Sequence, residues 1–235
     1  MIKAVFFDFY NTLVHFNPQR EEIQAQVCRN LGIEVSLEGL TRGYILADRF
    51  MERENAAEVP LARRSPGDLE SFFAKYERLI LRTAGVDTDL LTASRVWDQV
   101  LQIPYKLVLY DDVIAAFEIL KTQELTIGVI SNINRDMNAL SRDLGLESYL
   151  DFNVTSREVG HGKPHPPIFL KALERAGVEP HEALHVGDSY ASDVLGATGV
   201  GIHALLLDRN LTETHVTYST RISSLMEIPG YLYAV

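Results

Sequence analysis

Short, nearly continuous apolar runs alternate with amphipathic runs along much of the chain. Four of the apolar runs predict strands, at Ile2–Phe7, Leu125–Ile130, Ala183–Val186 and Ile202–Leu207. Uninterrupted apolar runs of this length are typical of parallel sheets, because helices cover both faces of each strand. The four runs therefore predict the strands of one buried, parallel sheet.

Helical patterns lie between the later strands. Asp112–Lys121 places its apolar residues on one stripe, and Pro166–Ala176 begins with proline and is followed by Gly177. Proline in the first turn and glycine just after the last turn are usual at helix ends. The alternation of strand and helix from about residue 106 onward predicts an α/β fold with a doubly wound, parallel-sheet (Rossmann-like) core.

The segment from 15 to 105 has a different pattern, with several amphipathic helical patterns and no convincing strand. One predicted helix ends at Gly32, and another begins at Ser65. We therefore expect an α/β catalytic core formed by residues 1–14 and 106–235. The all-helical segment 15–105 is expected to be a cap inserted after the first strand.

Composition narrows the classes of partner. The chain has 235 residues, with 32 acidic against 22 basic side chains and a formal net charge of −10 at pH 7. Nucleic acids and anionic membranes bind clustered Lys and Arg, so we expect neither as a partner. Cys28 is the only cysteine, which excludes an intramolecular disulfide and a cysteine-rich metal site. No apolar run is long enough for a secretory signal or a membrane span, so we expect a cytoplasmic protein. The oligomeric state stays open.

Polar side chains follow three of the predicted strands at the point where each strand ends. Asp8 follows the first strand, Ser131 and Asn132 follow the second, and Asp188 follows the third, with Asp193 five residues later. In a doubly wound sheet, ligands bind beyond the carboxyl ends of the strands. Each of these residues also fits an ordinary turn or helix cap, so none is decisive alone.

One lysine lies in a glycine-containing loop between the second and third of these motifs. The loop Gly160-His161-Gly162-Lys163-Pro164 contains two glycines and could bring Lys163 into a pocket. A single lysine, however, is more often a solvated surface charge. Asp188 and Asp193 would direct two carboxylates toward one place, which suits a hard cation such as Mg²⁺.

The order Asp, Ser, Lys, Asp-Asp at successive strand ends resembles the haloacid dehalogenase-like hydrolase superfamily, subfamily I with an α-helical cap. The resemblance covers the whole α/β part, and the helical insertion has the position of that cap. It implies that Asp8 is a nucleophile that forms a covalent aspartyl intermediate, which water later hydrolyses. It further implies that Ser131 donates a hydrogen bond to the transferring group and that Lys163 neutralises charge while restraining Asp8. Thr12 would stabilise the loop or contact the nucleophile, and Asn132 would supply a donor.

The resemblance also implies a magnesium site. Asp188 would hold Mg²⁺ together with Asp8 and the backbone carbonyl of Tyr10, and Asp193 would support the ion directly or through water. An anionic nucleophile that attacks a phosphoryl group requires such a compensating cation.

Tyr10 is a departure from the phosphatases of this superfamily, which usually have a second aspartate at that position as general acid and base. A phenol with a pKa near 10 is a poor base at neutral pH. Loss of positioned acid–base help typically costs about 10²- to 10⁴-fold in rate, most of all for poor leaving groups.

The 2-haloacid dehalogenases of the superfamily also have tyrosine at this position, and halide leaves without protonation. Those enzymes work without a metal and lack the Gly187-Asp188 arrangement. They bind the substrate carboxylate with a cap arginine, for which Arg42 and Arg49 are candidates. We therefore expect Mg²⁺-dependent hydrolysis of a small phosphorylated metabolite. Two alternatives stay open. The protein is a 2-haloacid dehalogenase, or it is a weakly active relative that binds a ligand or a protein partner.

Overall fold

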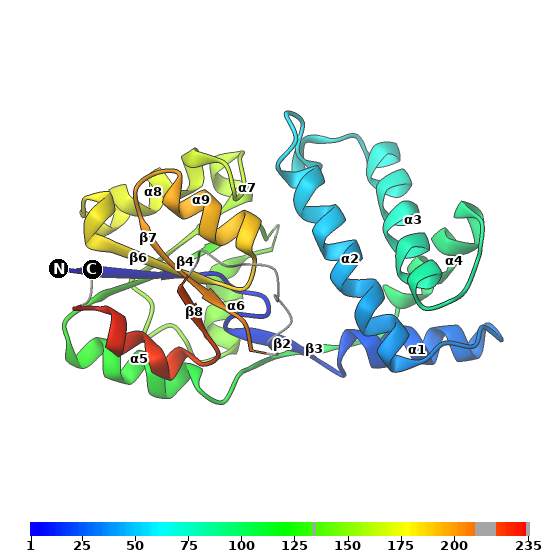
Figure 1. Cartoon of the computed structure of the whole chain (residues 1–235), viewed down its shortest axis with the longest axis horizontal. Coiled ribbons are helices and arrows are strands. Elements are labelled where there is room, and N and C mark those ends of the chain that lie inside the picture. The colour runs from blue at the N-terminus through cyan, green and yellow to red at the C-terminus, as the bar shows by residue number, and fades with distance from the viewer. Residues whose placement is uncertain (134, 210–219, 234–235) are drawn as a thin grey trace. The chain divides into compact units, whose positions relative to one another are not determined.

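A six-stranded sheet in which all neighbouring strands run parallel forms the centre of the α/β part (Figure 1). The computed structural model describes residues 1–133, 135–209 and 220–233. The strands are β1 (Ala4–Phe7), β4 (Thr126–Ser131), β5 (Phe152–Thr155), β6 (Ala183–Gly187), β7 (His203–Leu207) and β8 (Thr220–Ile222). This sheet confirms the predicted doubly wound, Rossmann-like core.

The strand order is β5-β4-β1-β6-β7-β8, so the chain builds outward from β1 on one side and then returns to build on the other. The pair β1 and β6 is therefore the point where the direction of winding reverses. Ligands of open α/β sheets bind beyond the carboxyl ends of the strands at such a point. The fold alone thus directs attention to the residues that follow Phe7 and Gly187.

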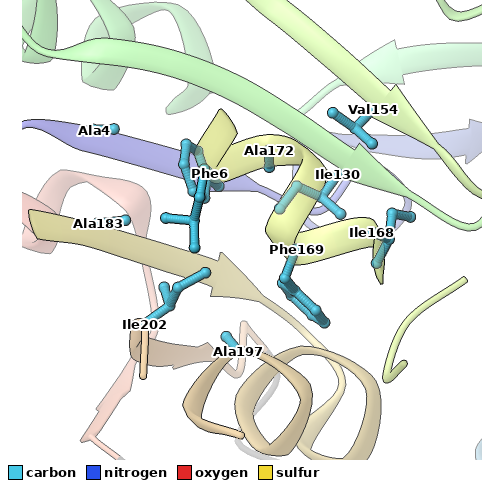
Figure 2. Packing of buried hydrophobic residues seen from close by; sticks show 11 residues of the cluster. Ala4, Phe6, Ile130, Val154, Ile168, Phe169, Ala172, Ala183, Ala197 and Ile202 are labelled. Carbon is cyan, nitrogen blue, oxygen red and sulfur yellow. The ribbon is translucent and has the colours of Figure 1, made fainter. Parts of the chain in front are cut away.

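Helices cover both faces of the sheet (Figure 1). The helices of this part are α5 (Val113–Thr122), α6 (Met137–Asp143), α7 (Ser156–Val159), α8 (Pro166–Ala176), α9 (Leu195–Thr198), the 3₁₀ helices η2 (Pro180–Glu182) and η4 (Leu225–Tyr231), and the π-helix η3 (Tyr190–Val194). Successive residues of β1 point to opposite faces. Phe6 joins a buried cluster with Phe169 of α8 (Figure 2), whereas the ring of Phe7 lies 5.1 Å from that of Phe117 on α5. Burial on both faces explains why β1 is apolar throughout.

The strands that the apolar pattern did not predict lie at the two edges of the sheet. β5 contains Asn153, and β8 has only three residues. Edge strands are often short and polar, because one of their sides lacks a neighbouring strand. The apolar signal therefore identified the four central strands and missed the two outer ones.

The chain divides into two compact units, formed by residues 1–15 with 108–235 and by residues 16–107. Helices build the second unit: α1 (Arg20–Asn30), α2 (Leu37–Asn55), the 3₁₀ helix η1 (Leu61–Arg63), α3 (Pro66–Thr83) and α4 (Leu90–Val100). Where the chain passes between the units, β2 (Val14–Asn17) and β3 (Lys106–Leu109) form a separate two-stranded sheet. The expectation of no strand after residue 15 is therefore wrong at that boundary.

The helical unit has its own buried core. Ser65 caps α3 by accepting a hydrogen bond from the Asp68 N–H, as its position in the sequence predicts. A Cβ added at Gly43 would lie 2.7 Å from the carbonyl oxygen of Ile80, so α2 and α3 pack backbone against backbone there. In the parts of the chain that the structure describes, no helix is both long and apolar enough to cross a membrane.

Candidate active site

Three carboxylates gather where the winding of the sheet reverses. Asp8 directly follows β1, and its N–H donates to the Val186 carbonyl of β6 at 2.9 Å. Asp188 follows β6, and Asp193 lies on η3. One oxygen from each of Asp8, Asp188 and Asp193 lies within 4.8 Å of the other two. The structure thus brings together three residues that the sequence separates by as many as 185 positions.

Lys163 inserts its ammonium group among these carboxylates. Its Nζ donates to Asp8 Oδ1 and lies 2.5 Å from Asp193 Oδ1. Only 2% of the lysine is exposed. A buried ammonium with two carboxylate partners is held in one position, unlike a solvated surface lysine. The glycine-containing loop therefore does carry Lys163 into the carboxylate cluster.

Asn132 holds the backbone of Lys163. Its side-chain Nδ2 donates to the Lys163 carbonyl at 2.9 Å, and its Oδ1 accepts from the Lys163 N–H at 2.7 Å. A Cβ added at Gly162 would lie 2.4 Å from that Oδ1, so this close contact requires glycine. The side chain of Asn132 thus positions the lysine. Ser131, the residue before Asn132, ends β4 and is buried.

Asp193 is fixed by three donors. Its Oδ1 lies 2.8 Å from His185 Nε2 as well as close to Lys163, and its Oδ2 accepts from the Ser189 N–H at 3.1 Å. An ionised carboxylate can only accept, so Nε2 of His185 carries the hydrogen. A Cβ added at Gly187 would lie 2.2 Å from Asp193 Cγ, which means that only glycine admits the carboxylate here.

The loop after Asp8 contacts the carboxylate cluster. Asn11 has a left-handed backbone with φ of 57°, and its Nδ2 donates to Asp188 Oδ2 at 3.3 Å. Thr12 is fully buried, and its Oγ1 has no hydrogen-bond partner among the described residues. Tyr10 is half-buried and forms a backbone bridge with Val14. The loop thus leaves one buried hydroxyl with capacity to bind a further group.

The charges of the cluster do not balance. Burial raises the pKa of Asp8, and the neighbouring Asp193 adds to this while Lys163 opposes it. Burial, together with the charges of Asp8 and Asp193, raises the pKa of Asp188 well above its usual range. Burial alone would raise the pKa of Asp193 too, but Lys163 and His185 lower it overall. One ammonium cannot neutralise three carboxylates, and clustered carboxylate oxygens are the ligands that Mg²⁺ prefers. The donor set therefore fits a divalent cation.

The arginine candidates lie on α2 of the helical unit. Arg42 is exposed and forms an ion pair with Glu38 one turn earlier, a common solvated arrangement on a helix surface. Arg49 is exposed as well. Neither residue has the burial that distinguishes Lys163.

A sequence profile of haloacid dehalogenase-like hydrolases matches residues 2–201, which includes every residue of the carboxylate cluster. The chain belongs to the haloacid dehalogenase-like hydrolase family. The predicted membership is thereby confirmed.

Similar proteins within the family differ in their reactions. The haloacid dehalogenase-like hydrolase domain-containing protein 3 of Xenopus laevis is 45% identical over 103 residues, 40% of this chain and 42% of that protein. Glyceraldehyde 3-phosphate phosphatase of Methanopyrus kandleri is 30% identical over 216 residues, 89% of this chain and 85% of that protein. The structure of a 2-haloacid dehalogenase from Pseudomonas syringae pv. Tomato is 28% identical with a TM-score of 0.59, and the match covers 99% of this chain and 98% of that one. The matched stretch is less than half the length of the Xenopus laevis protein and its relatives from mouse and zebrafish.

Two residues of the site escaped the sequence interpretation. His185 lies within an apolar strand and is fully buried, and Asn11 lies in the loop that follows Asp8. The signal for His185 was a polar residue in the middle of β6, where a side chain without a partner would be costly. For Asn11 the signal was weaker, because asparagine is common in left-handed turns without any further role.

Proposed function

We propose that this haloacid dehalogenase-like hydrolase is a Mg²⁺-dependent phosphatase that acts on a small phosphorylated metabolite through an aspartyl-phosphate at Asp8. The observation that carries the proposal is the charge imbalance of the cluster, in which three carboxylates lie together and one lysine contacts two of them. The similarity over most of the chain to glyceraldehyde 3-phosphate phosphatase of Methanopyrus kandleri supports the phosphate-ester class.

Asp8, Asp188 and the Tyr10 carbonyl would hold Mg²⁺, with Asp193 in support directly or through water. Bound Mg²⁺ would supply positive charge that offsets repulsion between the nucleophile and the phosphate. Lys163 would contact the transferring phosphoryl group while it restrains Asp8. Ser131 would donate to a phosphoryl oxygen, and Thr12 offers its buried hydroxyl on the loop after the nucleophile.

In the first step, an oxygen of Asp8 bonds to phosphorus and the bond from phosphorus to the leaving oxygen breaks. In the second step, water attacks the phosphorus, the bond from phosphorus to the Asp8 oxygen breaks, and a water proton passes to solvent. Phosphate is released and the Asp8 carboxylate is regenerated. Tyr10 stands where related phosphatases have an acid, so protonation of the leaving oxygen would depend on solvent or another group. We therefore expect activated aryl phosphates to be hydrolysed faster than alkyl phosphates.

Dehalogenation of a 2-haloacid is the second candidate. Tyr10 favours it, and so does the similarity to the dehalogenase of Pseudomonas syringae. The carboxylates of Asp188 and Asp193 oppose it, because a metal-free reaction has no use for two further buried acids beside the nucleophile.

One experiment separates the candidates. Release of p-nitrophenol from p-nitrophenyl phosphate and release of chloride from 2-chloropropionate are measured with MgCl₂ and with EDTA. We expect Mg²⁺-dependent phosphate hydrolysis that Asp8→Asn abolishes without loss of the folded state. Chloride release that EDTA leaves unchanged would replace the proposal by dehalogenation. If the protein turns over neither substrate but binds a ligand, the result would favour a weakly active relative whose role is binding.

A further inference from the structure

Arg209 lies at the centre of a half-buried group of polar contacts on the α/β unit, and the reaction above does not use it. It lies two residues after β7, and 15% of its side chain is exposed. Its Nη2 donates to the Thr12 carbonyl at 2.9 Å, and its Nη1 and Nη2 donate to the two oxygens of Asp112 at 3.0 and 2.9 Å. Its Cζ lies 3.9 Å from the centroid of the Tyr110 ring. The guanidinium thus has a paired carboxylate, a backbone acceptor and an aromatic face.

Asp112 fixes the guanidinium in turn. In addition to Arg209, its Oδ2 accepts from Ser224 Oγ at 2.7 Å and from the Leu225 N–H at 2.9 Å. A carboxylate with four donors from two other segments has little freedom to turn. Asp112 therefore anchors Arg209 to α5 and to the segment that begins η4.

The acceptor of Arg209 belongs to the loop that follows the nucleophile. In this loop Leu13 N–H donates to the Phe9 carbonyl at 2.9 Å, and Asn11 contacts Asp188. On the other side, Tyr110 N–H donates to the Leu13 carbonyl at 3.0 Å. The loop is thus held by Asp188 at one end and by the Tyr110 backbone and Arg209 at the other.

We propose that Arg209 is a positioning residue, which fixes the loop from Phe9 to Leu13 and through it the placement of Asp8 and of the Tyr10 carbonyl. The part of this inference that concerns turnover rests on the proposed function. Lysine would not replace arginine fully, because one ammonium cannot form the two-point pair with Asp112 and also lie flat on Tyr110.

The test compares Arg209→Met and Arg209→Lys with Arg175→Met. Arg175 is a matched control, because its guanidinium also contacts one carboxylate, Glu158, and one backbone carbonyl, that of Asn153. The first readout is amide hydrogen exchange of residues 9–13 in protein that circular dichroism shows to be folded. We expect faster exchange in Arg209→Met, a smaller change in Arg209→Lys, and no change in Arg175→Met.

The second readout is kinetic, with p-nitrophenyl phosphate and MgCl₂. A misplaced nucleophile lowers kcat more than it changes KM, so we expect kcat to fall by about tenfold or more in Arg209→Met. Asp112→Asn should also lower kcat, because it weakens the pair that anchors Arg209. Unchanged exchange of residues 9–13 overturns the inference, and so does an unchanged kcat in an active enzyme. If the wild-type protein hydrolyses no phosphate, the proposed function fails instead, and hydrogen exchange alone decides the role of Arg209.

Discussion

Each of the two units of this hydrolase contains a buried polar cluster, and the two clusters solve the problem of buried negative charge differently. In the helical unit, Glu77 accepts from Gln24 Nε2 at 2.5 Å, and Tyr44 donates to the same glutamine at 3.1 Å. The second oxygen of Glu77 has no partner among the described residues, and burial raises its pKa to about 8. Glu77 therefore holds a proton at neutral pH.

In the α/β unit, three acids lie together, and one lysine cannot neutralise all of their charge. Protonation of the remaining acids would affect the reaction. Lys163 keeps Asp193 ionised, whereas the pKa values of Asp8 and Asp188 are raised. Asp8, the nucleophile that we propose, must be ionised to attack, so its protonation would stop the proposed reaction. The comparison teaches that a single buried acid can be neutralised by a proton and be purely structural. A cluster with excess negative charge instead favours the binding of a cation.

The largest effect is expected when the ammonium of Lys163 is removed from the carboxylate cluster. Lys163→Met should lower kcat for p-nitrophenyl phosphate by about 10³-fold, because Asp8 and Asp193 lose their shared partner and the phosphoryl group loses a donor. Lys171→Met on α8 is the control, since the ion pair of that lysine with Glu174 lies on the surface. Near-normal turnover in folded Lys163→Met would contradict the role of the lysine.

A substitution of Asp188 should change activity and stability in opposite directions. Asp188→Asn should lower activity by about 100-fold and abolish the rise in Tm that Mg²⁺ gives the wild-type protein. In EDTA, the same variant should melt about 2–4 °C higher than wild type, because a like charge is removed from the cluster. Scanning calorimetry with and without MgCl₂ measures both effects. A variant that melts lower in EDTA would show that the three carboxylates do not repel one another.

His185 offers a sharper test, since two similar amides can replace it. In His185→Gln, the side-chain amide can place an N–H near the position of Nε2. In His185→Asn, the shorter side chain cannot reach Asp193. We expect His185→Asn to lower kcat about tenfold, which corresponds to the loss of one buried hydrogen bond, and His185→Gln to retain most of it. Equal losses in both variants would assign His185 to packing, for instance against Phe169.

The smallest effect on activity is expected in the helical unit. In the folded protein the pKa of Glu77 is about 8, above the ordinary value of 4.5, so the folded state retains a proton that the unfolded state releases. The contribution of Glu77 to the free energy of unfolding should therefore fall between pH 4.5 and pH 8, by at most about 1.4 kcal/mol per pH unit. Glu77→Gln should remove this contribution and leave kcat unchanged.

Urea unfolding at several pH values measures the Glu77 contribution. Glu38→Gln is the control, because Glu38 is exposed on α2. If Glu77→Gln had the same pH dependence as wild type, the buried glutamate would already be ionised in the folded protein.

The sequence predicted the parts of this molecule that depend on periodicity and order. Apolar runs predicted the four central strands. Polar residues at the strand ends made Asp8 and Asp188 candidates, the glycine-containing loop made Lys163 one, and the structure brings these residues together. The edge strands were missed because their residues are few and polar.

Contacts that depend on the direction of a side chain could not be predicted. Nothing in the local pattern indicates that Asn132 binds the Lys163 backbone or that His185 reaches Asp193. Those contacts exist because Gly162 and Gly187 leave space for a neighbouring side chain, which becomes visible only when distant segments are packed together.

The strand order also has a consequence for biosynthesis. β1 pairs with β4 on one side and with β6 on the other, and β6 leaves the ribosome long after Asp8 does. Until then, β1 presents an unpaired apolar edge to the cell, and Asp8 is not yet confined beside Asp188 and Asp193. Chains that terminate before Ala183 would combine an exposed edge with an incomplete site, so premature termination should yield aggregates rather than a partly active enzyme.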